Sequence, residues 1–484
     1  MIRTPISTLQ RVSVALLLVA GVVLVTHAVL SARASAITVN TTTDENNVDG
    51  DCSLREAIIA ANTDTAVDAC PAGNGADRIN LPAGTYTLTV AGTGEDAAHT
   101  GDLDITASVT IVGAGRTNTV IDANGIDRVL HILTGTVTLK DLKVTGGYSG
   151  GTFGGGILLD HVGNLTLDTV RVTGNSGNIG GIYASAGTLA IVSSRIDGNA
   201  GATAGGLSIN AGVTAVINNS EISDNTSSVS SAGISNLGSL TMINSTISGN
   251  GAQQDGGGIS TSGTGTTNLY NVTVANNTAD SDGNGSGVGG GVYNSAGTTF
   301  SAYNTIIGDN SAAAAVDCDS ADPIPVTRFN FNLLENTSGC TFTGSGSVNI
   351  FNQDPRLDPL AFNGGGVQTQ ALRSNSPAID AGNPLQCRDN SNAVLTIDQR
   401  GYARPIDGNA DGLAVCDMGA YEYNSPGTPT PTNTATPTRT STPTRTPTRM
   451  PTCVPGPDGC APTATATPTP FTPSHWVYLP VIQK

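Results

Sequence analysis

The chain has 484 residues, of which 12% are charged and 4% are aromatic, and its formal net charge at pH 7 is −17. This acidic balance argues against binding to nucleic acid and against non-specific attraction to anionic membranes. It is compatible with neutral glycans, with bound cations, or simply with solubility. The length allows several domains, although one repetitive domain would account for much of it.

Residues 1–36 have the pattern of a secretory signal. Arg3 and Arg11 precede an apolar core, and the segment closes on small residues that end at Ala36. We expect cleavage after Ala36 and no membrane-spanning segment in the chain that remains. An uncleaved membrane anchor is the alternative, because the apolar run is long. Either outcome predicts that the rest of the chain is exported.

Residues 37–75 combine an acidic turn with one short helix. Ser53 and Glu56 have the spacing of a capping box. One face of the predicted helix carries Leu54, Ala57, Ile58 and Ala61. The first coil of a solenoid exposes its apolar end and its unpaired strand edges, so we expect this helix to form the N-terminal lid.

Residues 76–327 are predicted to form the coils of a solenoid, most regular at about 137–310. One pattern returns there seven times, and the copies close on Gly147, Asn175, Asn199, Asn225, Asn250, Asn277 and Asn310. The spacings between these closing residues are 28, 24, 26, 25, 27 and 33. Positions ten, eight, five and three residues before the closing residue are mostly apolar, and a further apolar position usually follows Gly-Gly.

A period of this length with short strands and no helical periodicity is typical of a parallel β-solenoid. Three strands per coil would pair with the same strands of neighbouring coils, and parallel crossovers are right-handed. Six residues before each closing residue lies a polar corner, whose Asn side chains are placed to hydrogen-bond along the axis: Asp141, Thr169, Ser193, Asn219, Asn244, Asn271 and Asn304. Disorder and an antiparallel sandwich fit poorly, because the apolar columns keep fixed offsets.

We therefore predict an all-β fold, a right-handed parallel β-helix with a short N-terminal capping helix, a C-terminal closing domain and a disordered Thr/Pro-rich tail. The eight cysteines fall into four close pairs along the chain: Cys52 with Cys70, Cys318 with Cys340, Cys387 with Cys416, and Cys453 with Cys460. An even number in an exported chain favours disulfides, and no pair has the CxxC spacing of a zinc site. A structural disulfide is the expectation for each pair, although the sequence leaves the connectivity open.

Three stretches resemble known families. The string Cys-Ser-Leu-Arg-Glu-Ala at 52–57 resembles the CSLREA domain that opens many large bacterial surface β-helix proteins. The Asn-ended copies are similar to the β-helix repeats of the pectin-lyase-like superfamily. Residues 328–425 resemble the choice-of-anchor domain, notably through Asp354-Pro355-Arg356-Leu357 and Asp417-Met418-Gly419-Ala420-Tyr421-Glu422. These resemblances imply export, a β-helix and a closing domain next to a surface attachment, but no reaction.

The C-terminal end has a different composition. Residues 426–474 are rich in Thr and Pro and cannot form a core, so we expect an extended stalk. Residues 475–484 are apolar with a basic end and are too short to span a bilayer. They are similar to short tails on some exported proteins, so we expect a sorting tail, with a merely apolar terminus as the alternative.

A basic column is the first candidate site. Lys143, Arg171 and Arg195 lie four residues before the closing position in three successive copies. On an acidic protein, such a column suggests a site for an anionic glycan or the proton-abstracting base of a lyase. The alternative is neutralisation of nearby carboxylates in exposed ion pairs, which are common. Tyr270 and Tyr303, at matching positions in adjacent copies, are candidates for stacking on sugar rings, with ordinary packing as the alternative.

Two loops are candidates for calcium. The first contains Asp280, Asp282 and Asn284, the second contains Asp407, Asn409 and Asp411, and both match the first half of a calcium loop. Both lack the Glu that the pattern requires at position twelve. We expect either weak calcium sites or Asx-rich loops without metal.

No complete catalytic set emerges, and no catalytic residue is assigned. His131 and His161 have no repeated carboxylate partner in the sequence. The leading hypothesis is a secreted, cell-surface-attached monomer that is not an enzyme and serves in adhesion, glycan binding or structural display. Its expected partners are extracellular polysaccharides or cell-envelope components. The alternative is a calcium-dependent polysaccharide lyase that acts on an acidic polysaccharide.

Overall fold

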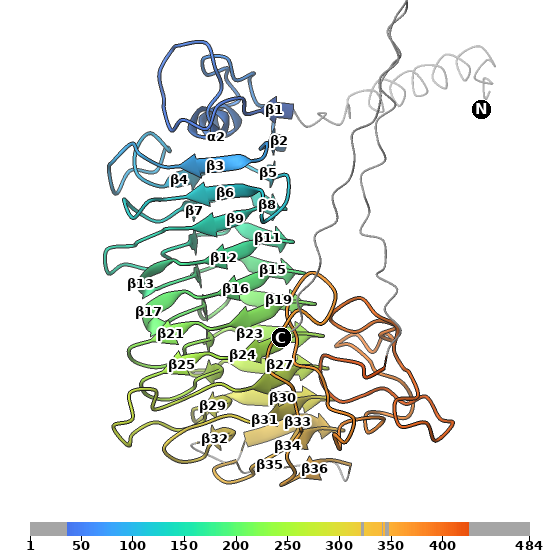
Figure 1. Ribbon diagram of the computed structural model, residues 1–484. Coiled ribbons are helices and arrows are strands. Elements are labelled where there is room, and N and C mark those ends of the chain that lie inside the picture. Colours follow the sequence, from blue (N-terminus) through green and yellow to red (C-terminus); the bar gives the residue numbers. More distant parts are fainter. Residues whose placement is uncertain (1–35, 321–323, 341, 344–347, 425–484) are drawn as a thin grey trace, which may run out of the picture. The chain divides into compact units, whose positions relative to one another are not determined.

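The computed structural model describes residues 36–320, 324–340, 342–343 and 348–424, and most of them form a right-handed parallel β-helix (Figure 1). The prediction of fold class is confirmed. The predicted signal segment (apart from Ala36), the Thr/Pro-rich stalk and the C-terminal tail lie outside the described residues.

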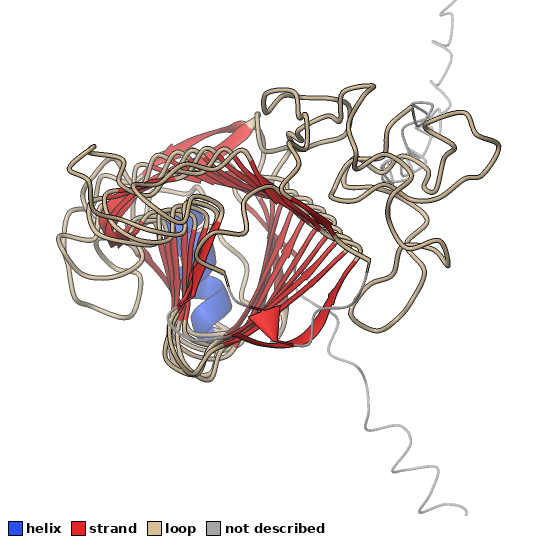
Figure 2. Cartoon of the chain, turned by 90° about the horizontal axis from the view of Figure 1, so that it is seen from below, coloured by secondary structure: helices blue, strands red, loops and turns tan. Residues whose placement is uncertain are grey.

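Three long parallel sheets make the three sides of the coils (Figure 2). Sheet 1 contains β1 (Ala36–Thr38), β2 (Asp77–Asn80), β5 (Val109–Val112), β8 (Thr136–Lys140), β11 (Asn164–Asp168), β15 (Thr188–Val192), β19 (Thr214–Asn218), β23 (Ser239–Ile243), β27 (Thr266–Tyr270), β30 (Thr299–Tyr303), β33 (Ile324–Asn330) and β35 (Phe342–Thr343). Sheet 2 contains β3 (Gly84–Thr87), β6 (Thr119–Asp122), β9 (Lys143–Thr145), β12 (Arg171–Thr173), β16 (Arg195–Asp197), β20 (Glu221–Ser223), β24 (Thr246–Ser248), β28 (Thr273–Ala275), β31 (Ile306–Gly308), β34 (Leu333–Leu334) and β36 (Ile350–Phe351).

Sheet 3 follows the Gly-Gly turns and consists of short strands. It contains β4 (Leu103–Ile105), β7 (Leu130–Ile132), β10 (Ile157–Leu159), β14 (Ile182–Ala184), β18 (Leu207–Ile209), β22 (Ile234–Asn236), β26 (Ile259–Thr261), β29 (Val292–Asn294) and β32 (Cys318–Ser320). A fourth, small sheet was not expected. It contains β13 (Ser176–Ile179), β17 (Ala200–Ala204), β21 (Thr226–Ser227) and β25 (Gly251–Ala252), where the loops after the closing Asn residues pair between coils.

The closing residues form a buried amide ladder inside the stack. Asn225 shows the pattern: its Oδ1 accepts hydrogen bonds from the backbone N–H and the Nδ2 of Asn199, each at 3.0 Å. Its Nδ2 donates to Asn250 Oδ1 at 3.0 Å and to the carbonyl oxygen of Ile196 at 2.8 Å. The same links run through Asn175, Asn199, Asn225, Asn250, Asn277 and Asn310. The closing Asn residues therefore satisfy buried backbone groups at a turn that each coil repeats.

Two other columns differ in part from their expected roles. The corner residues all have positive φ, as at Asn219 (49°) and Asn244 (45°), so they make left-handed turns. The predicted axial bond between corner Asn side chains forms where Asn304 Nδ2 donates to Asn271 Oδ1 at 2.8 Å. The position five residues before closing was expected to be mostly apolar, but it holds buried Ser194, Ser220 and Ser245 in the middle coils. Each of these hydroxyls accepts a hydrogen bond from a backbone N–H of the preceding coil, so a polar side chain is stable there.

The N-terminal helix α2 (Leu54–Thr63) covers the first coil, and Figure 2 shows it within the outline of the coils. Ser53 and Glu56 form the predicted capping box. Arg55 is fully buried, pairs with Asp44 at 2.7 Å, and donates hydrogen bonds to the carbonyl oxygens of Ala98 and Gly101. Arg55 therefore holds the lid onto a loop of the first coils.

The coils continue beyond the expected boundary at residue 328, which falls inside β33, and end at β36. The segment that follows, residues 353–424, was expected to close the end of the helix, and it instead packs along the side of sheet 2. Its Leu357, Leu372 and Met418 form an apolar cluster with Ile306 and Leu333 of sheet 2. Outward-facing apolar residues on these coils need cover, which explains the position. We call residues 353–424 the side segment.

Three of the four expected disulfides lie within the described residues. They join Cys52 to Cys70, Cys318 to Cys340 and Cys387 to Cys416, the pairs predicted from the sequence. The first holds the lid, and the third lies within the side segment. The fourth expected pair, Cys453 and Cys460, lies outside the described residues, so a disulfide between Cys453 and Cys460 stays a prediction.

The search for membrane-spanning elements covers the same residues. Among them, we find no helix with the length and apolar character that crossing a bilayer requires.

Candidate functional site

The basic column lies on the outer face of sheet 2. Arg171 is paired in register with Lys143 on one side and Arg195 on the other, as the repeat predicted. Arg171 forms a bidentate ion pair with Asp197 of the next coil. Arg195 is 8% exposed and lies beneath the side segment, with its guanidinium 5.2 Å from the ring centre of Phe362.

The tyrosines lie at the edge of the same covered region. The rings of Tyr270 and Tyr303 are 6.5 Å apart and tilted, and Tyr303 also meets the ring of Phe331 edge-on at 5.7 Å. Tyr303 is 8% exposed, and its hydroxyl oxygen accepts a hydrogen bond from Asn383 Nδ2 of the side segment. A sugar ring would reach the face of Tyr303 only after the side segment moved.

Both candidate calcium loops are organised by their own hydrogen bonds. Asp280 accepts from the backbone N–H of Gly285 at 3.1 and 3.2 Å, and Asn284 donates to Asp282. In the second loop, Asp407 accepts from the N–H groups of residues 411 and 412, and Asn409 and Asp411 also accept from loop N–H groups. These bonds are those of an Asx-rich loop, and in the first loop both oxygens of Asp280 and both of Asp282 accept them.

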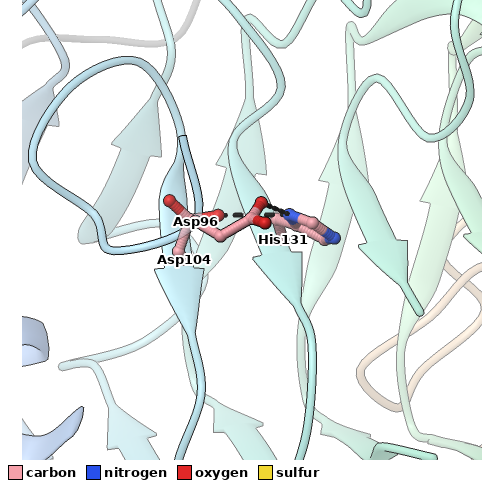
Figure 3. Close-up of side chains that lie close together, drawn as sticks. All are labelled: Asp96, Asp104 and His131. Carbon is pink, nitrogen blue, oxygen red and sulfur yellow. Dashed lines mark hydrogen bonds and ion pairs between the residues drawn. The ribbon is translucent and has the colours of Figure 1, made fainter. Parts of the chain in front are cut away.

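A different cluster gathers on the outer face of sheet 3 (Figure 3). Asp104 in β4 and His131 in β7 are neighbours in register, and His131 Nδ1 lies 3.1 Å from Asp104 Oδ1. Asp96, from the loop before β4, lies 3.7 Å from the same nitrogen. Carboxylate and imidazole atoms of these three residues are close enough to hold a metal ion.

The cluster continues into the next coil. Asp160, directly after β10, lies 4.0 Å from His131 Nε2 and 3.3 Å from His161 Nδ1. Burial raises the pKa of Asp160, but hydrogen bonds from the Ser185 hydroxyl and from the backbone N–H of His161, with the nearby imidazoles, outweigh it and lower the pKa. Asp160 is therefore a stable anion beside two histidines.

Aromatic side chains border this cluster. Tyr183, in β14, occupies the same outward column as His131, with Leu158 of the coil between them. Burial raises the pKa of Tyr183, and the charge of Asp160 raises it further. Its ring lies 4.8 Å from that of Phe153, at an angle of 33°. Phe153 is 43% exposed and Tyr148, in the same loop, is 51% exposed. Aromatic rings thus lie beside carboxylates on a side other than the one that the side segment covers.

A second, purely acidic group lies near the C-terminal coils. One cavity is lined by Asp309, Glu335 and Asp354. A second cavity, of about 460 Å³, is also lined by Asp309 and Asp354. Burial, followed by the charges of Glu335 and Asp354, raises the pKa of Asp309 to about 6. Burial raises the pKa of Asp317 to about 6 despite its hydrogen bonds. These oxygens are of the type that calcium prefers, as are those of Glu45, Asp49 and Asp51 in the lid.

Sequence reasoning missed the sheet 3 cluster. The sequence did carry a signal for it in the strands of sheet 3, because the residue that follows the first inward apolar residue of each strand points outward. In successive coils this residue is Asp104, His131, Leu158 and Tyr183. The contribution of Phe153, from a loop of irregular length, had no such signal.

No protein-family model and no curated protein matches the chain. Among solved structures, a crystal structure of pectate lyase Pel9A is similar, with a TM-score of 0.45 and 13% sequence identity. The alignment covers 81% of this chain and 98% of that chain. A likeness at this level assigns no activity to the present chain.

Proposed function

We propose that this protein is an exported, surface-displayed β-helix that binds glycans on the outer face of sheet 3 without cleaving them. The observation that carries the proposal is the exposed ring of Phe153, packed against Tyr183, which lies close enough to Asp160 for that carboxylate to raise its pKa. A sugar ring has C–H groups on its faces and hydroxyls at its edge. Aromatic rings complement the faces, and carboxylates accept hydrogen bonds from the hydroxyls.

Export and display are supported by other parts of the chain. Three disulfides lie in the described residues, and disulfides persist mainly in oxidising compartments. The signal-like residues 1–36 and the resemblances to CSLREA and choice-of-anchor domains point the same way. The Thr/Pro-rich residues 426–474 would act as a stalk that holds the β-helix away from the cell surface.

The lyase alternative receives no comparable support. A lyase of this kind needs a basic side chain at the substrate, and the column of Lys143, Arg171 and Arg195 supplied the candidates. Arg171 is held by Asp197 and Arg195 by Glu221, and Arg195 lies beneath the side segment. These ion pairs favour a structural role for the two arginines.

The test is to incubate the purified full-length chain with a panel of neutral and uronate polysaccharides, with and without calcium. Binding is measured by affinity electrophoresis, and cleavage by the ultraviolet absorbance of unsaturated sugar products. The proposal predicts retarded migration on at least one polymer with a flat absorbance trace. A calcium-dependent rise in absorbance would establish the lyase alternative, and absence of both signals would leave a structural display protein.

A further inference from the structure

Both nitrogens of the His131 ring face carboxylates. On one side, Nδ1 lies 3.1 Å from Asp104 Oδ1 and 3.7 Å from Asp96 Oδ1 (Figure 3). On the other side, Nε2 faces Asp160 Oδ2 at 4.0 Å. A neutral imidazole has one N–H group and one lone pair, so one of its nitrogens directs a lone pair at carboxylate oxygen.

The surroundings of the ring make such a contact costly. His131 is 6% exposed, Asp104 is fully buried, and His131 Nε2 has no hydrogen-bond partner among the described residues. A buried lone pair that faces an anion is unfavourable unless a cation or a proton lies between the two groups. Nδ1 faces two carboxylates and Nε2 faces one, so a cation on the Nδ1 side would be stabilised more.

The loop that carries Asp96 is fixed beside Asp104. The backbone N–H of Ala98 donates to Asp104 Oδ2 at 2.9 Å, and the carbonyl oxygen of Ala98 accepts from the buried Arg55 of the lid at 2.9 Å. Both carboxylate oxygens of Glu95 accept from backbone N–H groups of the same loop. The Asp96 side chain is nevertheless 67% exposed, which gives an ion a path from solvent.

The facing atoms of Asp96, Asp104 and His131 have the spacing of metal ligands. They all lie within 4.8 Å of one another. At bonds of about 2.1 Å, atoms 3.1 and 3.7 Å apart subtend angles of about 95° and about 124° at a zinc ion, on either side of the tetrahedral angle of about 109°. The ion would replace the proton between His131 Nδ1 and Asp104, because an imidazole nitrogen binds metal through its lone pair.

We propose that a divalent transition-metal ion of the zinc class binds to Asp96 Oδ1, Asp104 Oδ1 and His131 Nδ1. Such ions accept one imidazole and two carboxylates as ligands, whereas calcium prefers oxygen ligands alone. A fourth position is left for water. With the ion on Nδ1, the N–H group is on Nε2 and faces the Asp160 carboxylate, so neither nitrogen directs a lone pair at an anion.

The proposed ion joins three segments of the first coils. Asp96 comes from the loop before β4, Asp104 from β4, and His131 from β7 of the next coil. Arg55 of the lid holds the same loop, so the ion also secures the lid to the coils. The unfolded chain does not hold these three residues together, so binding should stabilise the folded protein.

The test uses the full-length chain without an affinity tag, stripped with a chelator and dialysed, and the metal alone as the probe. Zn²⁺ binding is measured by calorimetry, Co²⁺ binding by its visible absorption, and thermal unfolding is followed with and without Zn²⁺. The site variants are Asp96→Ala and His131→Gln. The controls are His161→Gln, beside Asp160 on the Nε2 side of the ring, and His99→Gln, in the loop that carries Asp96.

We expect the wild type to bind one equivalent and to unfold at a higher temperature with Zn²⁺ than without it. Changes next to a ligand already cost about 10- to 100-fold in metal affinity, so loss of a direct ligand in either site variant should cost at least about tenfold. Both histidine controls should bind as the wild type does.

Circular dichroism checks that the variants fold. Because the Asp96 side chain is 67% exposed, Asp96→Ala should fold normally, and it tests the site even if the buried His131→Gln does not fold. The proposal is overturned if the wild type binds no metal, if Asp96→Ala binds it as the wild type does, or if a histidine control loses it.

Discussion

Arg195 and Glu221 face each other across β16 and β20, with Arg195 Nε 2.9 Å from Glu221 Oε2. Glu221 is fully buried. Gln368 of the side segment contacts both partners, because its backbone N–H donates to Glu221 at 2.7 Å and its side-chain oxygen accepts from Arg195 at 2.7 Å. The pair therefore joins the side segment to the coils, in the column that the sequence suggested as a ligand site.

Replacing Arg195 with Met should destabilise the protein by about 3–5 kcal/mol, because Glu221 is left buried without its cation. Burial raises the pKa of Glu221 and Arg195 opposes this, so the variant should raise it further. Urea unfolding at pH 7 measures the loss. The control is Lys143→Met in the same column, which we expect to change the free energy of unfolding by about 0.5 kcal/mol or less. Equal losses in the two variants would show that the buried pair is not the cause.

The amide ladder makes a separate prediction. Asn225→Ala removes a carbonyl oxygen that accepts two hydrogen bonds and an amide nitrogen that donates two, which leaves buried groups of Asn199, Asn250 and Ile196 without these partners. Each unpaired buried group costs about 1–3 kcal/mol, so we expect a total loss of about 3–5 kcal/mol in urea unfolding.

The control for the ladder is Asn218→Ala, at an outward position of β19 seven residues earlier. This variant should unfold close to the wild-type midpoint, because an outward side chain can exchange its hydrogen bonds for water. A loss as large as that of Asn225→Ala would mean that the ladder contributes nothing special.

The acidic cavity predicts a pH dependence with a definite sign. The pKa of Asp309 is about 6 in the folded protein, above the ordinary value of 3.8, so the folded state holds its proton more tightly than the unfolded state does. The contribution of this group to stability is complete below about pH 4 and is lost as the pH rises through about 6. Asp309→Asn cannot ionise, so its stability relative to the wild type should increase between pH 4 and pH 7.

Glu335→Gln provides the matched comparison for this cavity. The charge of Glu335 is the largest contribution after burial to the raised pKa of Asp309, so this variant should move that pKa down. In a chain that already carries Glu335→Gln, adding Asp309→Asn should therefore change the free energy of unfolding with pH by less than it does in the wild type. Unfolding series at several pH values check both statements. A relative stability of Asp309→Asn that falls as the pH rises would contradict the assignment.

Sequence predicted the coils well because their determinants are local and repeated. Each coil must bury the same apolar positions, so Val137, Leu165 and Leu189 recur at one offset and pair in register. Ser53 and Glu56 define a capping box by spacing alone, and the cysteine pairs are close in the chain. The Ser column was predicted less well, since a hydroxyl is stable there only because a backbone N–H of the neighbouring coil reaches it.

The contacts of the candidate residues were harder to predict, because residues that meet in the structure are distant in sequence. Arg195 and Gln368 are 173 residues apart, and no repeated pattern links the side segment to the coil that it covers. The same repeat that suggested an exposed basic column therefore gave no sign of its burial. His131 and Asp104 lie in adjacent coils, and aligning the outward residues of the third strands would have found their pairing.

The most direct test of the proposed glycan site compares two single variants for affinity to the polysaccharide that the wild type binds best. Phe153→Ala removes the exposed ring of the loop before β10, which packs against Tyr183 of sheet 3, and Tyr270→Ala removes a tyrosine at the edge of the covered face. We predict that Phe153→Ala weakens binding about tenfold, equivalent to about 1.4 kcal/mol, and that Tyr270→Ala binds as the wild type does. Unchanged binding by Phe153→Ala together with a loss in Tyr270→Ala would contradict the assignment to sheet 3.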